Sequence, residues 1–177
     1  MRTLIRMLAT AILLLVMAAA GAVAYVKSTG LRGQPTPGPI ETRVSRAVRS
    51  LAVPADMKAR TLPADVSATS LWLGMEHYAK YCALCHANNG SGERTPLGSG
   101  LFPKPPDLRT NLTQDLTDGE LFYIIDNGVR FTGMPAFGTG ESTPAGDKQL
   151  WELVQFVRRL PKLTADEIAE MEGMNPL

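Results

Sequence analysis

Cysteine, aromatic residues and alternating hydrophobic segments are all scarce in this chain of 177 residues. Its two cysteines lie three residues apart, so none is left to form a disulfide between distant segments, and cysteine usage does not report the compartment. Aromatic residues make up 6% of the chain, and residues 70–160 contain no Lys/Arg stripe interleaved with them, which argues against nucleic-acid binding. No segment alternates with a period of two, so no β-sheet is expected.

The two cysteines and one histidine form the stretch Cys82-Ala83-Leu84-Cys85-His86. Cys-x-x-Cys-His is the spacing at which c-type haem is attached covalently. Cysteines three apart on one helical turn share a face and can form thioethers to the two haem vinyl groups, while the histidine reaches the iron. A thioether is the soft second axial ligand of many electron-carrying haems, and Met134 is the candidate here. The alternative for Met134 is core packing, which is what most methionines do.

The motif has two other interpretations. A thioredoxin-like redox pair would need a βαβ setting, which the sequence lacks. A zinc site would need a fourth ligand, for which only His77 is obvious. His77 is therefore better interpreted as a helix residue than as a ligand.

The N-terminus indicates export and anchoring. Arg2 and Arg6 precede an uncharged stretch from Met7 to Val26, which ends at Lys27. Twenty helical residues span about 30 Å, the thickness of a bilayer core. We expect a single-pass anchor in a bacterial inner membrane, with the following domain in the periplasm. The alternative is a soluble periplasmic protein released by cleavage after Ala24, since Ala22-Val23-Ala24 is a small-x-small site.

The charge and composition divide the chain into four parts. Residues 1–26 form the anchor or uncleaved signal, 27–67 a linker with several prolines and glycines, 68–161 the haem domain, and 162–177 a short tail helix. The front is basic, since residues 1–69 carry nine Lys/Arg against three Asp/Glu. Within the linker, Val44, Val48 and Leu51 share one face of a possible short helix, which would rest on anionic lipid, on a partner, or on the haem domain.

Within the haem domain, three segments have helical periodicity. Residues 71–82 lead into the haem motif, residues 117–127 begin with a capping box, and residues 147–160 end at Pro161. Another capping-box pattern at residues 164–167 predicts a solvated tail helix. Helices of this size make a thin core for about 90 residues, so we expect a haem to supply much of the apolar filling.

The order of these features resembles the class I monohaem c-type cytochromes of the bacterial type, in a membrane-anchored form. The similarity covers roughly residues 70–160 and rests on the Cys-x-x-Cys-His motif and on Gly133-Met134-Pro135. It implies an all-α, small cytochrome c fold, with three to five helices around one covalently bound haem, preceded by a transmembrane helix and an extended linker. It also implies that Met134 is the axial methionine. The first and last helices of the fold would cross near Gly74 and Tyr78 against Trp151 and Phe156.

In the same family a proline carbonyl accepts a hydrogen bond from the second ring nitrogen of the axial histidine. Pro96, ten residues after His86, is the first candidate for this role, and Pro103 and Pro105 compete with it.

The expected function is one-electron transfer by an electron carrier that is not itself an enzyme. Two protein axial ligands, His86 and Met134, leave no open site for a small-molecule substrate. The partners would be redox proteins or membrane respiratory complexes, and no nucleic acid. The alternatives are a fixed cytochrome subunit of a larger oxidoreductase and, from a different class, a gas sensor or haem enzyme in which Met134 detaches.

Overall fold

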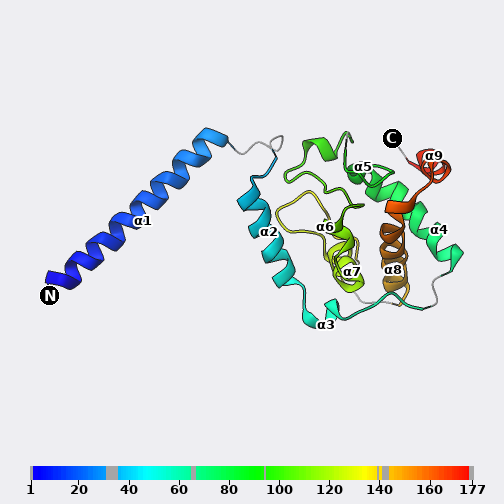
Figure 1. The fold of residues 1–177 in the computed structure, drawn as a ribbon, viewed down its shortest axis with the longest axis horizontal. Helices are drawn as coiled ribbons and strands as arrows, with labels where there is room; N and C mark the ends of the chain where they lie inside the picture. Colours follow the sequence, from blue (N-terminus) through cyan, green and yellow to red (C-terminus); the bar gives the residue numbers. More distant parts are fainter. Residues whose placement is uncertain are drawn as a thin grey trace. The chain divides into compact units, whose positions relative to one another are not determined.

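The computed structural model describes residues 2–30, 36–64, 67–93, 95–138, 140 and 144–175, and within these residues the chain is helical and contains no strand (Figure 1). The all-α fold expected from the sequence is confirmed. The α-helices are α1 (Arg2–Thr29), α2 (Pro39–Ala52), α3 (Ala55–Lys58), α4 (Ala68–His77), α5 (Ala83–His86), α6 (Asn111–Gln114), α7 (Asp118–Asn127), α8 (Pro144–Arg159) and α9 (Ala165–Met174). A π-helical turn, η1 (Tyr78–Cys82), joins α4 to α5, and the short 3₁₀ helices are η2 (Gly98–Gly100) and η3 (Leu160–Lys162).

The helix α1 forms a unit of its own, and α2 to α9 belong to a second unit. The described part of the chain contains one helix long and apolar enough to cross a membrane, and this is α1, whose mean hydropathy reaches 2.4. It has no buried residue. It extends beyond the predicted stretch of Met7 to Val26 at both ends. Its length and composition fit a single-pass anchor and a signal sequence equally well.

The core of the second unit is built where α4 and η1 cross α8. Gly74 makes the crossing possible, because a Cβ at this position would overlap the carbonyl oxygen of Glu152. Next to it the rings of Tyr78 and Phe156 lie 5.2 Å apart and 52° inclined. The predicted crossing therefore holds for these residues. Trp151 instead contacts α7, where its ring lies 4.6 Å from that of Phe122.

The helices α7 and α9 begin where their sequences predict. Both capping boxes form: the Thr117 hydroxyl accepts from the backbone N–H of Glu120, and the Thr164 hydroxyl accepts from that of Glu167. The helix α9 is less solvated than expected, because Met171 is fully buried in the same core as α4 and α8. The tail helix thus contributes to the core of the domain.

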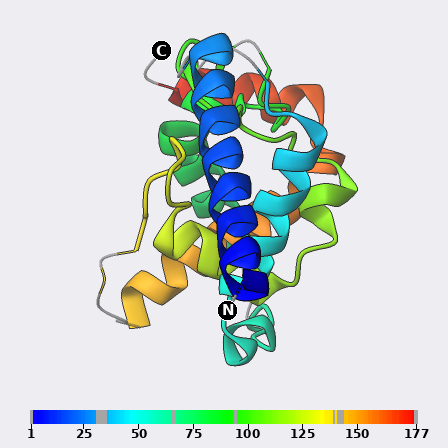
Figure 2. The same cartoon turned by 90° about the vertical axis from the view of Figure 1, so that its left-hand side faces the viewer.

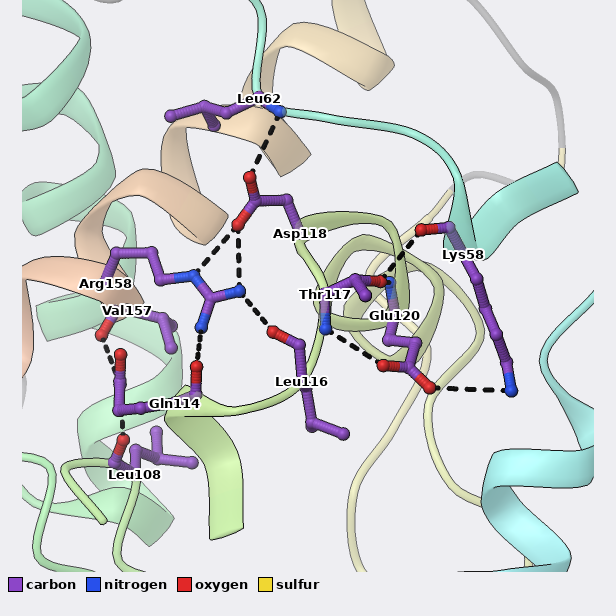
Figure 3. Close-up of polar contacts among 10 residues, drawn as sticks. All are labelled: Lys58, Leu62, Leu108, Gln114, Leu116, Thr117, Asp118, Glu120, Val157 and Arg158. Carbon is purple, nitrogen blue, oxygen red and sulfur yellow. Dashed lines mark hydrogen bonds and ion pairs between the residues drawn. The ribbon is translucent and has the colours of Figure 1, made fainter. Parts of the chain in front are cut away.

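Part of the predicted linker packs on the domain through its backbone (Figure 3). The Thr117 hydroxyl donates to the Lys58 carbonyl at 3.0 Å, and the backbone N–H of Leu62 donates to the Asp118 carboxylate at 3.3 Å. A Cβ at Gly119 would overlap the carbonyl oxygen of Met57, so only glycine lets this segment come so close to α7.

Arg60 fastens the same segment to the core. Its guanidinium carbon lies 4.4 Å from the ring centroid of Phe122 and 5.2 Å from that of Trp151, and it pairs with Asp147 at 3.1 Å. Val53 at the start of the segment is 5% exposed. We name residues 53–62 the docked segment.

A set of hydrogen bonds from Arg158 of α8 binds the connection between α6 and α7 to α8. Arg158 donates to the carbonyl oxygens of Gln114, at 2.6 Å, and Leu116, and to the Asp118 carboxylate at 2.9 Å (Figure 3). One side chain therefore satisfies three acceptors of the loop that leads into α7.

Candidate functional site

Cys82, Cys85 and His86 lie on one continuous stretch of helix, from η1 into α5. The stretch ends directly after the histidine, where Ala87 has a φ of 61°. The Tyr78 hydroxyl donates to the Ala87 carbonyl at 3.1 Å, and this bond ties the strained turn to the buried helix. The motif therefore sits on a rigid element, with its backbone turning away after His86.

The two thiols are free and are not activated. Burial, and secondarily the neighbouring Cys85, raises the pKa of Cys82 to about 12, and burial also raises the pKa of Cys85. A thioredoxin-like pair needs a lowered thiol pKa, because the thiolate is the nucleophile. The environment of Cys82 is thus the opposite of that in a redox-active pair.

The loop after the motif packs against Cys85 through Thr95, a residue that belongs to no sequence motif. The Thr95 hydroxyl donates to the Cys85 carbonyl at 3.1 Å and accepts from the backbone N–H of Gly98 at 3.0 Å. A Cβ at Gly98 would lie 2.5 Å from the Cys85 carbonyl oxygen and 3.1 Å from the Pro105 side chain. No periodic or spacing signal marks Thr95, since its role depends on a contact across ten residues.

His86 is half-buried, and its Nδ1 is fully buried without a hydrogen-bond partner among the described residues. Burial lowers the pKa of His86, and the Pro106 carbonyl partly opposes this by raising it. Pro106 comes close because Gly92 donates its N–H to the His86 carbonyl at 2.8 Å, and a Cβ at Gly92 would lie 2.6 Å from the Pro105 carbonyl oxygen and 3.2 Å from that of Pro106.

Pro96 is not the proline beside this ring in the structure. It is exposed, and its carbonyl accepts from the Ser99 hydroxyl at 3.3 Å. Among the proline carbonyls, that of Pro106 is the one that raises the pKa of His86. The positive φ values of Gly90 and Gly92, 76° and 70°, turn the chain so that residue 106 reaches the ring.

Met134 lies in the loop of residues 128–138, which contains no helix and is drawn in yellow in Figures 1 and 2. The Met134 N–H donates to the Thr132 hydroxyl at 3.1 Å, and its carbonyl accepts from the Val129 N–H at 3.1 Å. Gly128, with a φ of 66°, lets the loop return to the end of α7, since a Cβ there would lie 2.7 Å from the Met134 carbonyl oxygen. The side chain is half-buried and packs against the core.

A cavity of about 430 Å³ lies beside Cys82. His77 of α4, Tyr81 of η1 and Phe137 of the Met134 loop line it. Leu150 and Leu153 line it from α8. His86 and Met134 are not among its lining residues. The His77 ring is 6.4 Å from that of Tyr81. The cavity joins the first thiol to the loop that carries Met134.

The donor set fits haem better than a bare metal ion. The described residues contain no group of three His, Cys, Asp or Glu side chains placed to hold a metal ion. They do contain two thiols three positions apart on one stretch of helix and an adjacent imidazole with a buried, unpaired Nδ1, beside a cavity of mixed character that Leu150, Leu153 and Phe137 line together with polar residues such as Asp126 and Gln149. These are the groups that haem c requires.

Fold and site together support a c-type cytochrome, since a cytochrome c domain implies haem c binding and supports haem-based electron transfer. Residues 71–157 match the family described as cytochrome C oxidase, cbb3-type, subunit III. No curated protein matches the chain. The matched region lies inside the predicted haem domain of residues 68–161 and contains the motif and Met134.

Proposed function

We propose that this cytochrome carries single electrons through one haem c, attached covalently to Cys82 and Cys85, with His86 and Met134 as the axial ligands of the iron. The observation that carries the proposal is the helical turn bearing both thiols and His86 within a matched cytochrome c domain. Haem c, when bound, supplies a one-electron redox couple.

The residues around the motif would hold and orient the ligands. Tyr78 and Thr95 fix the backbone on either side of His86, and the Pro106 carbonyl is the acceptor available to its second ring nitrogen. Such a bond would set the tautomer and make the imidazole a stronger donor to iron. The bonded loop of residues 128–138 would present the Met134 thioether.

The proposed location is the periplasmic side of a bacterial inner membrane, with α1 as a retained anchor. Arg2 and Arg6 in the first turns of α1, ahead of its uncharged stretch, favour a cytoplasmic N-terminus. Redox proteins or membrane respiratory complexes would then donate and accept the electron at the exposed edge of the haem, through a weak and transient surface.

A second candidate is a fixed cytochrome subunit of a larger oxidoreductase. The description of the matched family, subunit III of a cbb3-type oxidase, favours it. The two candidates differ in what is purified. A fixed subunit would copurify in mild detergent with other chains at constant stoichiometry, whereas a mobile carrier would be isolated alone.

Visible spectra of the protein purified from membranes test the ligand assignment. We expect a low-spin c-type spectrum with a sulfur-to-iron charge-transfer band and no response to carbon monoxide. Met134→Ala should lose the band and bind carbon monoxide, whereas the control Met174→Ala, another half-buried methionine, should keep the wild-type spectrum. A wild-type protein that binds carbon monoxide readily would contradict the assignment and favour a sensor or haem enzyme.

Covalent attachment is tested separately by extraction with acidified acetone. Haem should stay with the wild-type polypeptide, and the double variant Cys82→Ala with Cys85→Ala should release it. Release from the wild type would refute the thioether assignment.

A further inference from the structure

The helix α2 carries an unpartnered apolar stripe. Ile40, Val44, Val48 and Leu51 are 76%, 57%, 59% and 85% exposed, and no residue of α2 is buried. The spacing of four, four and three residues puts them on one face along the whole helix. A single exposed apolar residue needs no explanation, but a continuous helical stripe does.

This stripe faces away from the domain to which α2 belongs. The two half-buried residues of α2 are Thr42 and Arg49, and both lie on the opposite side of the helix from Val44 and Leu51. Burial lowers the pKa of Arg49, which agrees with a position against the domain. At the C-terminal end of α2, the Lys58 ammonium donates to the Ser50 carbonyl at 2.7 Å. The sequence alone left open whether the apolar face docks on the haem domain, and the structure excludes this for the described residues.

The helix α2 is basic overall, with three arginines against one glutamate. Exposed Arg43 borders the stripe on one side, Arg46 lies farther round the helix towards Thr42, and Glu41 borders the stripe beside Val48. Arginine can lay its aliphatic stem on an apolar surface and hold its guanidinium at a phosphate. An apolar stripe on a helix with an excess of arginine is typical of helices that lie in the interface of an anionic bilayer.

The covalent chain also keeps α2 near the membrane that α1 can span. Nine residues separate Thr29, the last residue of α1, from Pro39, the first residue of α2. Even fully extended, this connection reaches no more than about 35 Å. When α1 is inserted in a bilayer, the short connection therefore keeps the stripe within reach of that bilayer, which is a large apolar surface.

We propose that α2 lies in the headgroup region of an anionic bilayer, with Ile40, Val44, Val48 and Leu51 directed towards the acyl chains and Arg43 at the edge of the stripe against a lipid phosphate. The Thr42 and Arg49 side of the helix then faces the cytochrome domain, so α2 forms a platform between lipid and domain. This role is additional to electron transfer and does not depend on the haem ligands.

Hydrogen exchange of the full-length haem protein in nanodiscs tests the proposal. One set contains phosphatidylcholine alone, and the other contains phosphatidylcholine with phosphatidylglycerol. We expect the amides of residues 43–52 to exchange about tenfold more slowly in the anionic nanodiscs, and this protection to decrease as salt is added. Val44→Ser with Val48→Ser should abolish the protection, since serine and valine have similar helix propensities and the change removes mainly apolar area.

The matched control is Leu112→Ser, which removes a 54% exposed leucine outside α2 and should leave the exchange of α2 unchanged. The visible spectrum of each variant reports whether the haem domain is intact, so a failed domain is distinguishable from a failed lipid contact. Equal exchange of α2 in both kinds of nanodisc, or equal protection in the wild type and the valine variant, would overturn the proposal. Protection that appears only in native membranes, and not in protein-free lipid, would assign the stripe to a protein partner and also overturn it.

Discussion

Replacing Gly119 with alanine tests whether the docked segment is part of the folded domain. The new Cβ would overlap the carbonyl oxygen of Met57 and lie 2.9 Å from its carbonyl carbon and 3.0 Å from the Arg60 carbonyl oxygen. These are backbone atoms, so a rotamer change cannot relieve the overlap. The docked segment must therefore shift away from α7.

The expected cost follows from the contacts that such a shift breaks. The hydrogen bonds from Thr117 to the Lys58 carbonyl and from Leu62 to Asp118 contribute about 1 kcal/mol each, and the stacking of Arg60 on aromatic rings contributes about 1 kcal/mol. Alanine returns up to about 1 kcal/mol through its higher helix propensity. The free energy of unfolding should fall by about 2 kcal/mol.

Denaturant unfolding followed by far-ultraviolet circular dichroism measures this change, and hydrogen exchange locates it. The amides of residues 55–62 should exchange faster in Gly119→Ala than in the wild type. The most slowly exchanging amides of α4 should be the same ones in both proteins. Gly173→Ala is the matched control, because a Cβ added to this helical glycine would have nothing within 4 Å, and the variant should lose no stability. If Gly119→Ala is as stable as the control and residues 55–62 exchange as in the wild type, the reasoning is refuted.

Three further substitutions test other contacts. Gly74→Ala should lower the free energy of unfolding by about 2–4 kcal/mol in denaturant melts, because its Cβ would overlap the Glu152 carbonyl at the crossing of α4 and α8. Arg158→Met should cost about 2–3 kcal/mol in the same assay, because it leaves the carbonyls of Gln114 and Leu116 without this donor and removes the ion pair with Asp118. For Glu167, hydrogen bonding to the Thr164 backbone N–H lowers the pKa of the carboxyl, so its contribution is complete above the ordinary value of about 4.3 and is lost as the pH falls through the lower folded-state value. The stability of the wild type should therefore fall between about pH 5 and pH 3, and that of Glu167→Gln should fall less over the same range. Identical pH profiles of unfolding free energy would contradict this.

Features encoded by neighbouring residues could be predicted from the sequence. The haem motif occupies one helical turn, and the capping boxes at Thr117 and Thr164 use residues three positions apart, so local chemistry decides both. The crossing at Gly74 was also predicted, although from a family resemblance. Each of these depends on few residues and little tertiary context.

Features that depend on contacts between distant residues could not be predicted. The docked segment can pack on α7 only because residue 119 is a glycine, and this residue lies about 60 positions after Met57, whose carbonyl it contacts. The composition of the linker does not indicate this contact. The approach of Pro106 to His86 depends on the turn at Gly90 and Gly92, which have positive φ values. Met171 is one of several apolar residues in an acidic tail, so its burial depends on the surface that α9 contacts.

The helix α2 and the docked segment, which both belong to the domain unit, also change how far the haem domain can travel from an anchor. A linker of residues 27–67 would reach about 140 Å when fully extended, whereas the nine residues between α1 and α2 reach at most about 35 Å. The volume available to the domain is then smaller by a factor of about sixty, and its local concentration at a neighbouring membrane complex rises in the same proportion. Retained as an anchor, α1 would make this cytochrome a short-range carrier that serves partners beside it in the bilayer.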